Sequence, residues 1–302
     1  GRKGSTDEGG VRSPLHMRWP AKIKPGTEVK QISAAIDLLP TLAEMCGIEA
    51  ASKKPLDGVS VANLLTAGQG SDALEDRLIF SHWGGKVSVR SQQYRLDHTG
   101  KLYDMPTDGG QRKDVAKEHP RMAKRLSDAV VAWKGDVLAE LKRGDRKFPV
   151  GHPDSLYTQL PARDAKTDGK LQRSNRFPNC SYFTNWKTSG DRLTWNVDVL
   201  TSGDYEVEMY YTCPQADVGS TVEVSFGESR TTAKIETPHD PPVVGAANDR
   251  VKRQESYVKD FRPMSLGKIH LEEGEGTLVL KATDIPGSQV GEFRLLMLTR
   301  VQ

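Results

Sequence analysis

The first residues of the chain combine a lysine with glycines in a pattern that suits the binding of an anion. Lys3 is followed by Gly4, and Gly9-Gly10 come directly after the acidic pair Asp7-Glu8. A lysine is a mobile point charge suited to a tetrahedral dianion such as sulfate or phosphate, and glycines let backbone N–H groups approach the same anion. The alternative is a solvated surface turn, in which lysine beside glycine is common.

Two charged residues of this segment are predicted to support the loop rather than to bind a ligand. Arg12 follows Glu8 by four positions and Asp7 by five. We expect Arg12 to pair with one of these carboxylates and so to hold the shape of the loop.

Two side chains farther along the chain are predicted to bind substrate. His82 follows a strand and precedes Gly84-Gly85, where it would hydrogen-bond a substrate hydroxyl or sulfate while Trp83 stacks on a sugar ring. The alternative is an aromatic pair packed at the edge of a sheet. Arg90 lies at a strand end, and its rigid five-donor fork suits a second anionic group on the substrate; the alternative is an ion pair with an acidic neighbour.

Several motifs in the first half of the chain resemble those of the sulfatase family, in the same order and at similar spacing. The glycine-rich segment that carries Lys3, called the lysine loop below, leads to Arg18-Trp19-Pro20. Ala21 follows, where the family usually has glycine. The other motifs lie at residues 36–42, 56–60, 89–90, 94–96 and 102–104. This half of the chain resembles the carboxyl-terminal part of an arylsulfatase-like enzyme.

The resemblance implies a hydrolase that releases sulfate from a sulfated carbohydrate or an aryl ester. Lys3 would bind a sulfate oxygen and assist the leaving alkoxide. Such enzymes use formylglycine, made from Cys or Ser in a C/S-x-P-x-R motif, and a divalent cation, usually Ca²⁺, held by an early Asp-Asp and a later Asp-Asn pair.

This chain lacks both of those motifs. None of its three cysteines has the required context, and no Asp-Asn dipeptide occurs. We therefore expect the nucleophile and the metal ligands upstream of Gly1, and no metal site in the chain itself. The chain alone is expected to be inactive, because removing the nucleophile from a cooperating set removes most of the rate.

Composition excludes some classes of partner. The 302 residues include 43 basic and 40 acidic side chains, a net charge of +3, with no basic stripe of the kind that binds nucleic acid. The sequence has no apolar run long enough to span a membrane and no signal peptide at its start. The family resemblance points to a periplasmic or extracellular protein, and the oligomeric state is left open.

Residues 1–142 are predicted to form an α+β domain, which the resemblance identifies as the carboxyl-terminal subdomain of an alkaline-phosphatase-like fold. Asp37 is expected to cap a helix that ends at Gly47. The apolar face of that helix would carry Leu39, Leu42, Ala43 and Cys46. Short strands near residues 78–80, 86–90, 94–96 and 101–103 form a mostly antiparallel sheet, and an amphipathic helix runs from Pro120 to about Lys142.

The rest of the chain is predicted to be a linker followed by an all-β module. Residues 143–154 hold charges, glycine and proline with little periodicity, which is typical of a linker. Residues 155–302 alternate apolar and polar side chains in many short segments, which favours a β-sandwich. The part from Trp186 onward resembles the jelly-roll modules, of carbohydrate-binding type, that are appended to enzymes acting on glycosides.

Aromatic residues of this module are candidates for a platform on which a sugar stacks. They are Trp186, Trp195, Tyr205, Tyr210 and Tyr211. The alternation along the strands places Trp195 and Tyr205 in the core, and it places Tyr210 and Tyr211 on opposite faces of one strand. Cys180 and Cys213 either form a disulfide or stay as thiols.

Three functions remain open from the sequence. A sulfuric ester hydrolase is the first, with a sulfated glycan as its partner. A phosphate or phosphonate ester hydrolase of the wider alkaline-phosphatase-like group would use a similar lysine loop. A non-catalytic glycan-binding protein would use the sandwich alone.

Overall fold

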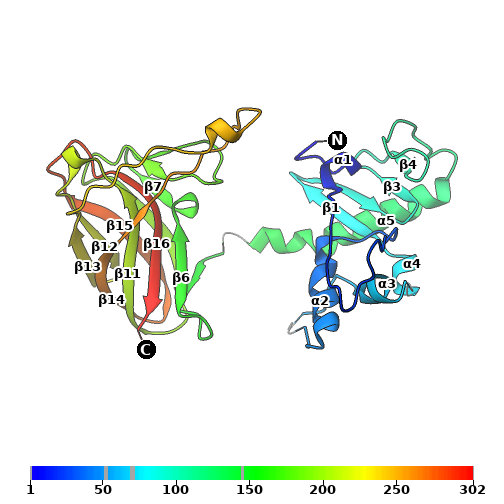
Figure 1. Cartoon of the computed structure of the whole chain (residues 1–302), viewed down its shortest axis with the longest axis horizontal. Helices are drawn as coiled ribbons and strands as arrows, with labels where there is room; N and C mark the ends of the chain where they lie inside the picture. The colour runs from blue at the N-terminus through cyan, green and yellow to red at the C-terminus, as the bar shows by residue number, and fades with distance from the viewer. Residues whose placement is uncertain (1, 51–53, 69–71, 144–145, 302) are drawn as a thin grey trace. The chain divides into compact units, whose positions relative to one another are not determined.

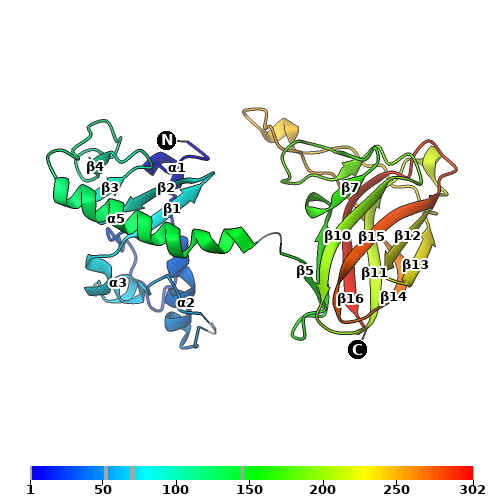
Figure 2. The same cartoon turned by 180° about the vertical axis from the view of Figure 1, so that it is seen from behind.

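The computed structural model describes residues 2–50, 54–68, 72–143 and 146–301. The chain divides into two compact units, Gly1–Gly144 and Asp145–Gln302, each with its own core (Figures 1 and 2). The two units are described separately below.

A four-stranded antiparallel sheet organises the first unit. Its strands lie in chain order: β1 (Ile79–Trp83), β2 (Lys86–Arg90), β3 (Tyr94–Leu96) and β4 (Leu102–Asp104). Gly84 and Gly85 join β1 to β2 at φ +52° and +80°, the positive values that a tight hairpin turn between twisted strands requires. The short strands predicted from the sequence are confirmed.

The helix α5 (Pro120–Asp136) covers one face of this sheet (Figure 2). Leu126 is fully buried against the core residues Val89, Leu96 and Leu102, and Phe80 stacks on Trp133 with ring centroids 5.2 Å apart. Pro120 occupies the first turn, where the missing N–H costs nothing. The helix was predicted to continue to Lys142, but α5 ends at Asp136 and the 3₁₀ helix η2 (Leu138–Arg143) follows.

The other helices of this unit are short. They are α1 (Glu8–Val11), η1 (Ala35–Asp37), α2 (Leu38–Cys46), α3 (Ala62–Thr66) and α4 (Asp72–Glu75). Gly47 ends α2 at φ +67°, as predicted.

Asp37 occupies the N-cap position of α2, as predicted, but its side chain does not cap the helix. Asp37 makes no capping hydrogen bond to α2; its carboxylate accepts the backbone N–H groups of Ala34 and Val59 and a two-pronged ion pair from Arg77, at 2.8 Å for each prong. Burial alone would raise the pKa of Asp37, but the hydrogen bonds from Arg77, Val59 and Ala34 outweigh it and lower that pKa. Asp37 therefore ties together three segments of the chain.

The predicted apolar face of α2 is right for Ala43 but wrong for Leu39, Leu42 and Cys46. Leu39 and Leu42 are 53% and 45% exposed, whereas Thr41, Ala43 and Met45 are buried. The hydroxyl of Thr41 accepts the backbone N–H of Val61, which turns this side of α2 toward α3. A hydrogen bond that only the tertiary fold provides has decided which face of the helix is buried.

The second unit is a sandwich of two six-stranded sheets. One sheet has the order β13-β12-β15-β10-β5, with β7 paired to β10, and the other has the order β14-β11-β16-β9-β8, with β6 paired to β16. All pairings are antiparallel except that of β5 with β10. The predicted β-sandwich is confirmed.

The bounds of the twelve strands that form these sheets are as follows: β5 (Phe148–Val150), β6 (Tyr157–Pro161), β7 (Lys166–Asp168), β8 (Gln172–Arg173), β9 (Phe183–Thr184), β10 (Arg192–Val199), β11 (Gly203–Thr212), β12 (Thr221–Phe226), β13 (Ser229–Lys234), β14 (Arg262–Leu271), β15 (Gly274–Asp284) and β16 (Glu292–Arg300). Three short 3₁₀ helices lie between them: η3 (Ala162–Asp164), η4 (Gln215–Asp217) and η5 (Ala246–Asn248).

The strand β5 lies inside the predicted linker 143–154. Val150 is fully buried, and β5 pairs in parallel with β10. This part of the predicted linker thus belongs to a sheet of the second unit, while residues 144–145 lie outside the described residues. A three-residue strand with a proline at its centre and a lysine before it lacks the alternation that would predict it.

Aromatic side chains predicted as a sugar platform fill the core between the two sheets. Trp186, Trp195, Tyr205 and Tyr211 are at most 3% exposed, and only Tyr210 is half-buried. The hydroxyls of Tyr205 and Tyr211 donate to the carbonyls of Thr201 and Thr237, both at 2.6 Å. The core placement of Trp195 and Tyr205 is confirmed, and the remaining rings do not form a platform. Cys180 and Cys213 are free thiols.

Candidate functional site

The lysine loop, residues 2–12, folds back on itself at the edge of the first unit. The N–H of Ser5 donates to the carbonyl of Arg2 at 3.0 Å, and that of Gly10 donates to the carbonyl of Asp7 at 2.8 Å. A Cβ at Gly10 would lie 2.4 Å from the carbonyl oxygen of Ser5, which explains why this position needs glycine. Lys3 is exposed.

Trp83 packs beside this loop. A Cβ at Gly4, whose φ is +83°, would lie 3.3 Å from Nε1 of Trp83. The indole side chain is 63% exposed, so it remains accessible next to the segment that carries Lys3. The segment that carries Lys3 and the exposed indole of Trp83 therefore lie side by side in the fold, although Lys3 and Trp83 are 80 positions apart in the sequence.

Glu8 anchors the loop to the sheet. Its carboxylate accepts hydrogen bonds from Arg95 at 2.7 and 3.2 Å, and the Arg95 side chain is 4% exposed. Arg95 also donates to the carbonyl of Thr6, which accepts a second bond from the hydroxyl of Ser88 at 2.6 Å. The backbone N–H of Glu8 donates to the side chain of Gln111 at 2.7 Å.

The strand register explains this arrangement. Arg90 and Arg95 are paired across β2 and β3, and Tyr103 is paired with Arg95 across β3 and β4, so these side chains share one face of the sheet. That face lies opposite to α5, and the N-terminal segment with α1 runs over it (Figure 1). The lysine loop is thus fixed to the polar face of the sheet by buried charge.

Arg90 belongs to the same network. Its guanidinium donates to the carbonyls of Ser91 and Gln92, and its Nε lies 3.8 Å from the Glu8 carboxylate. Burial lowers the pKa of Arg90, and the charge of Arg95 lowers it further, while Glu8 opposes both. The structure places Arg90 among protein acceptors, which matches the ion-pair alternative, and its binding of a second anion stays a prediction.

Arg12 and His82 are placed differently. Arg12 lies 3.8 Å from Glu8 but its side chain is 79% exposed, so it is the outermost cation of the network. His82 pairs with Val87 on the helix side of the sheet, and its ring lies 6.4 Å from that of Trp133 in α5. The structure therefore brings Glu8, Arg12 and Arg90 together, carries Lys3 on the same loop, and places His82 on the other face of the sheet.

Sequence reasoning missed Arg95, Ser88 and Gln111. Arg95 lies in a short strand between two buried apolar residues. A buried arginine in that setting needs a partner for its charge, but only the structure identifies that partner as Glu8. The contact of Gln111 with Glu8 has no such signal.

The described residues do not form a metal centre. Within residues 2–50, 54–68, 72–143 and 146–301, no group of three or more His, Cys, Asp or Glu side chains has the arrangement of a metal site. The residues present therefore do not fit the divalent cation that sulfatases require.

Comparison with known proteins assigns the first unit to a family. Residues 3–128 match the family model described as N-sulphoglucosamine sulphohydrolase, C-terminal. This segment is a sulfatase carboxyl-terminal region. It contains the lysine loop, the sheet and most of α5, so the sulfatase region and the anchored loop coincide.

Proteins that are similar in sequence to part of this chain include sulfatases. A sulfatase of Formosa agariphila is 31% identical over 159 residues, which cover 44% of this chain and 28% of that protein. Bovine arylsulfatase A is 37% identical over 97 residues, covering 31% of this chain and 18% of the enzyme. The chain thus spans less than a third of the length of these relatives.

Solved structures resemble about half of this chain, and only loosely. The carboxyl-terminal CBM6 of LamC from Zobellia galactanivorans has 12% identity and a TM-score of 0.33, covering 48% of this chain and 99% of that one. A family 35 carbohydrate binding module from Clostridium thermocellum has 13% identity and a TM-score of 0.34, covering 49% and 100%. The fold of the second unit therefore rests on the sheet pairings described above.

Helices in the described part of the chain are all too short or too polar to cross a bilayer.

Proposed function

We propose that this chain is the carboxyl-terminal part of a sulfuric ester hydrolase that releases inorganic sulfate from a sulfated carbohydrate or an aryl ester. The observation that carries the proposal is the lysine loop, which lies within a sulfatase region and is anchored to the sheet through Glu8 and Arg95. The buried ion pair holds the loop in place, because removing either partner would leave an uncompensated buried charge.

Lys3 is the residue that acts on the sulfate group. Its ammonium neutralises charge on a sulfate oxygen and on the alkoxide that leaves when the S–O bond breaks. The anchored loop holds the backbone from which Lys3 extends, and so it restricts where the ammonium can lie. Trp83, beside Gly4, presents an indole face that suits the C–H groups of a sugar ring.

The nucleophile and the cation come from outside this chain. In the family, formylglycine supplies the attack on sulfur and a divalent cation, Ca²⁺ in many cases, supplies charge neutralisation. Cys46 and Cys180 are exposed and Cys213 is buried, but none of them lies in a C/S-x-P-x-R motif. The chain alone is therefore inactive. The complete enzyme acts outside the cytoplasm. Its second unit holds the enzyme on a glycan.

The phosphate ester alternative is less well supported, because the named relatives of the first unit are sulfatases. Activity of the protein encoded by the complete reading frame separates the two. Turnover of 4-nitrophenyl sulfate and none of 4-nitrophenyl phosphate is the expected result. A protein that hydrolyses only the phosphate ester would overturn the proposal, and the chain of 302 residues serves as the inactive control.

A further inference from the structure

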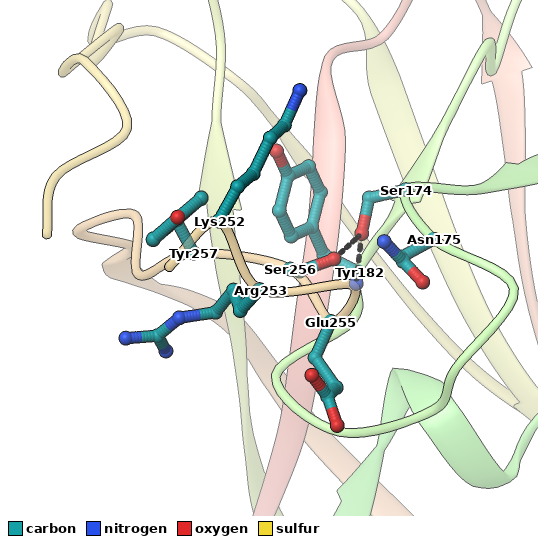
Figure 3. Close-up of a pocket in the computed structure, with 8 residues that line it drawn as sticks. All are labelled: Ser174, Asn175, Tyr182, Lys252, Arg253, Glu255, Ser256 and Tyr257. Carbon is teal, nitrogen blue, oxygen red and sulfur yellow. Dashed lines mark hydrogen bonds between the residues drawn. The ribbon is translucent and has the colours of Figure 1, made fainter. Parts of the chain in front are cut away.

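A pocket outside the sulfatase region lies at one end of the sandwich (Figure 3). It has a volume of about 250 Å³ and lies between two loops of the second unit. The β8–β9 loop contributes Ser174, Asn175 and Tyr182, and the long β13–β14 loop contributes five residues between Lys252 and Tyr257. Pockets for drug-sized ligands hold roughly 300–1,000 Å³, so this one suits a single sugar residue of a longer chain.

The two loops are joined by several hydrogen bonds. The hydroxyls of Ser174 and Ser256 lie 2.9 Å apart, and Ser174 also accepts the backbone N–H of Tyr182 at 3.2 Å (Figure 3). Asn175 donates to the carbonyl of Gln254 at 2.5 Å, and Arg176 donates to its side chain at 3.0 Å. These bonds hold the walls of the pocket in place, so a ligand that binds there orders few further side chains and loses little conformational entropy.

The aromatic side chains of the pocket are fixed as well. Tyr182 packs on Phe261 with ring centroids 5.2 Å apart. The guanidinium of Arg253 covers one side of the Tyr257 ring at 4.6 Å and is itself held by Asp249 at 2.7 and 3.1 Å. The pocket thus combines rigid rings with hydroxyl and amide groups, which is the chemistry that recognises a saccharide.

Both segments that line the pocket are basic. Residues 163–176 and 249–262 together hold ten Lys and Arg residues and five Asp and Glu residues, whereas the whole chain is nearly balanced at 43 and 40. Arg173 and Arg176 donate to carbonyl, hydroxyl and amide oxygens rather than to carboxylates. The positive charge at this end of the sandwich is therefore not fully neutralised within the protein.

Lys252 is the cation that projects from the pocket lining. Its side chain extends in the same direction as the Tyr182 ring, whereas Glu255 extends the opposite way (Figure 3). Among the residues that the structure describes, no carboxylate lies within ion-pair distance of Lys252, although Arg253 beside it is paired with Asp249. An exposed lysine next to a ring and hydroxyl groups is placed to meet an anionic substituent on a sugar.

We propose that this pocket binds a saccharide that carries an anionic group, a sulfate or a carboxylate, with Lys252 contacting the charge and Tyr257 and Asn175 contacting the ring. The proposal deepens the glycan-holding role given to the second unit above and rests on that part of the proposed function. It also gives the sandwich the same class of ligand that the sulfatase region cleaves.

Calorimetric titration of the 302-residue chain at 50 mM salt tests the proposal. The probes are tetrasaccharides of chondroitin sulfate, heparin and carrageenan, each beside its chemically desulfated form, together with tetragalacturonate. We expect at least one anionic probe to bind at least tenfold more tightly than desulfated carrageenan, which carries neither sulfate nor carboxylate. We also expect Lys252→Gln to weaken that binding about tenfold, since a charge-assisted hydrogen bond is lost.

A matched variant localises the effect. Lys268→Gln removes an exposed lysine of β14 that already faces Glu206 at 3.8 Å. It should not change the dissociation constant more than twofold. Tight binding of tetragalacturonate alone would identify the carboxylate as the anion.

Equal affinity for the anionic probes and for desulfated carrageenan, which carries neither sulfate nor carboxylate, would overturn the proposal, as would equal affinity of Lys252→Gln and the unmodified chain. So would the absence of binding by every anionic probe at 1 mM. Absence of sulfatase activity in the protein encoded by the complete reading frame, with pocket binding intact, would instead contradict only the catalytic part of the proposed function.

Discussion

Replacing Arg95 by methionine tests whether buried charge anchors the lysine loop. Methionine keeps much of the volume of the arginine stem and removes its guanidinium, which donates to Glu8 at 2.7 and 3.2 Å and to Thr6 at 3.1 Å. Breaking a buried ion pair by removing one partner costs about 3–5 kcal/mol. We expect the lower end, about 3 kcal/mol, because the Glu8 side chain is 16% exposed and keeps Arg12 and Arg90 at 3.8 Å.

Hydrogen exchange resolved by peptide is the assay, because it reports the stability of each unit separately. A loss of 3 kcal/mol corresponds to roughly 100-fold faster exchange in peptides from the lysine loop and the sheet of the first unit. Peptides from the sandwich should not change. Arg12→Met is the matched control, and because its side chain is 79% exposed the loss should stay below about 0.5 kcal/mol. Equal effects of the two variants would refute the view that Arg95 and Glu8 hold the loop.

Two further predictions concern the first unit. Gly10→Ala should destabilise the first unit by about 1–3 kcal/mol, because its Cβ would lie 2.4 Å from the carbonyl oxygen of Ser5. Gly135→Ala in α5 should stabilise it by about 0.5–1 kcal/mol, because the added Cβ meets nothing within 4 Å and alanine favours a helix. Urea unfolding of both variants measures the two changes and checks that their signs are opposite. Because the folded pKa of Asp37 is lowered from 3.8, its stabilisation is complete at neutral pH and is lost as the pH falls through that lowered value. Asp37→Asn should flatten the acid limb of the stability profile, and an unchanged slope below about pH 4 would contradict the role of the Arg77 pair.

Local patterns in the sequence predicted much of the architecture. The apolar spacing from Met122 onward identified α5, the glycines at 84 and 85 marked the β1–β2 turn, and alternation placed Trp195 and Tyr205 in the core. Each of these signals lies within a few residues of the element that it predicts. Short-range stereochemistry and periodicity are sufficient for such elements.

Contacts between distant segments were not predictable in the same way. Glu8 meets Arg95 across 87 positions, and Thr41 meets Val61 across 20. The first contact fixes the candidate site, and the second decides that Leu39 and Leu42 are exposed. A partner that the fold supplies from far along the chain leaves no trace in local spacing, so the site residues Arg95 and Ser88 were found only in the structure.

Lys3→Ala in the protein encoded by the complete reading frame tests the central claim most directly. If Lys3 assists the leaving alkoxide, kcat should fall about 10²–10³-fold for an alkyl or sugar sulfate and much less for 4-nitrophenyl sulfate, whose leaving group needs little help. Lys24→Ala, which removes another exposed lysine of the same unit, should leave both rates unchanged. An unchanged kcat for the sugar sulfate in Lys3→Ala would contradict the assignment of this loop to the chemistry of sulfate esters.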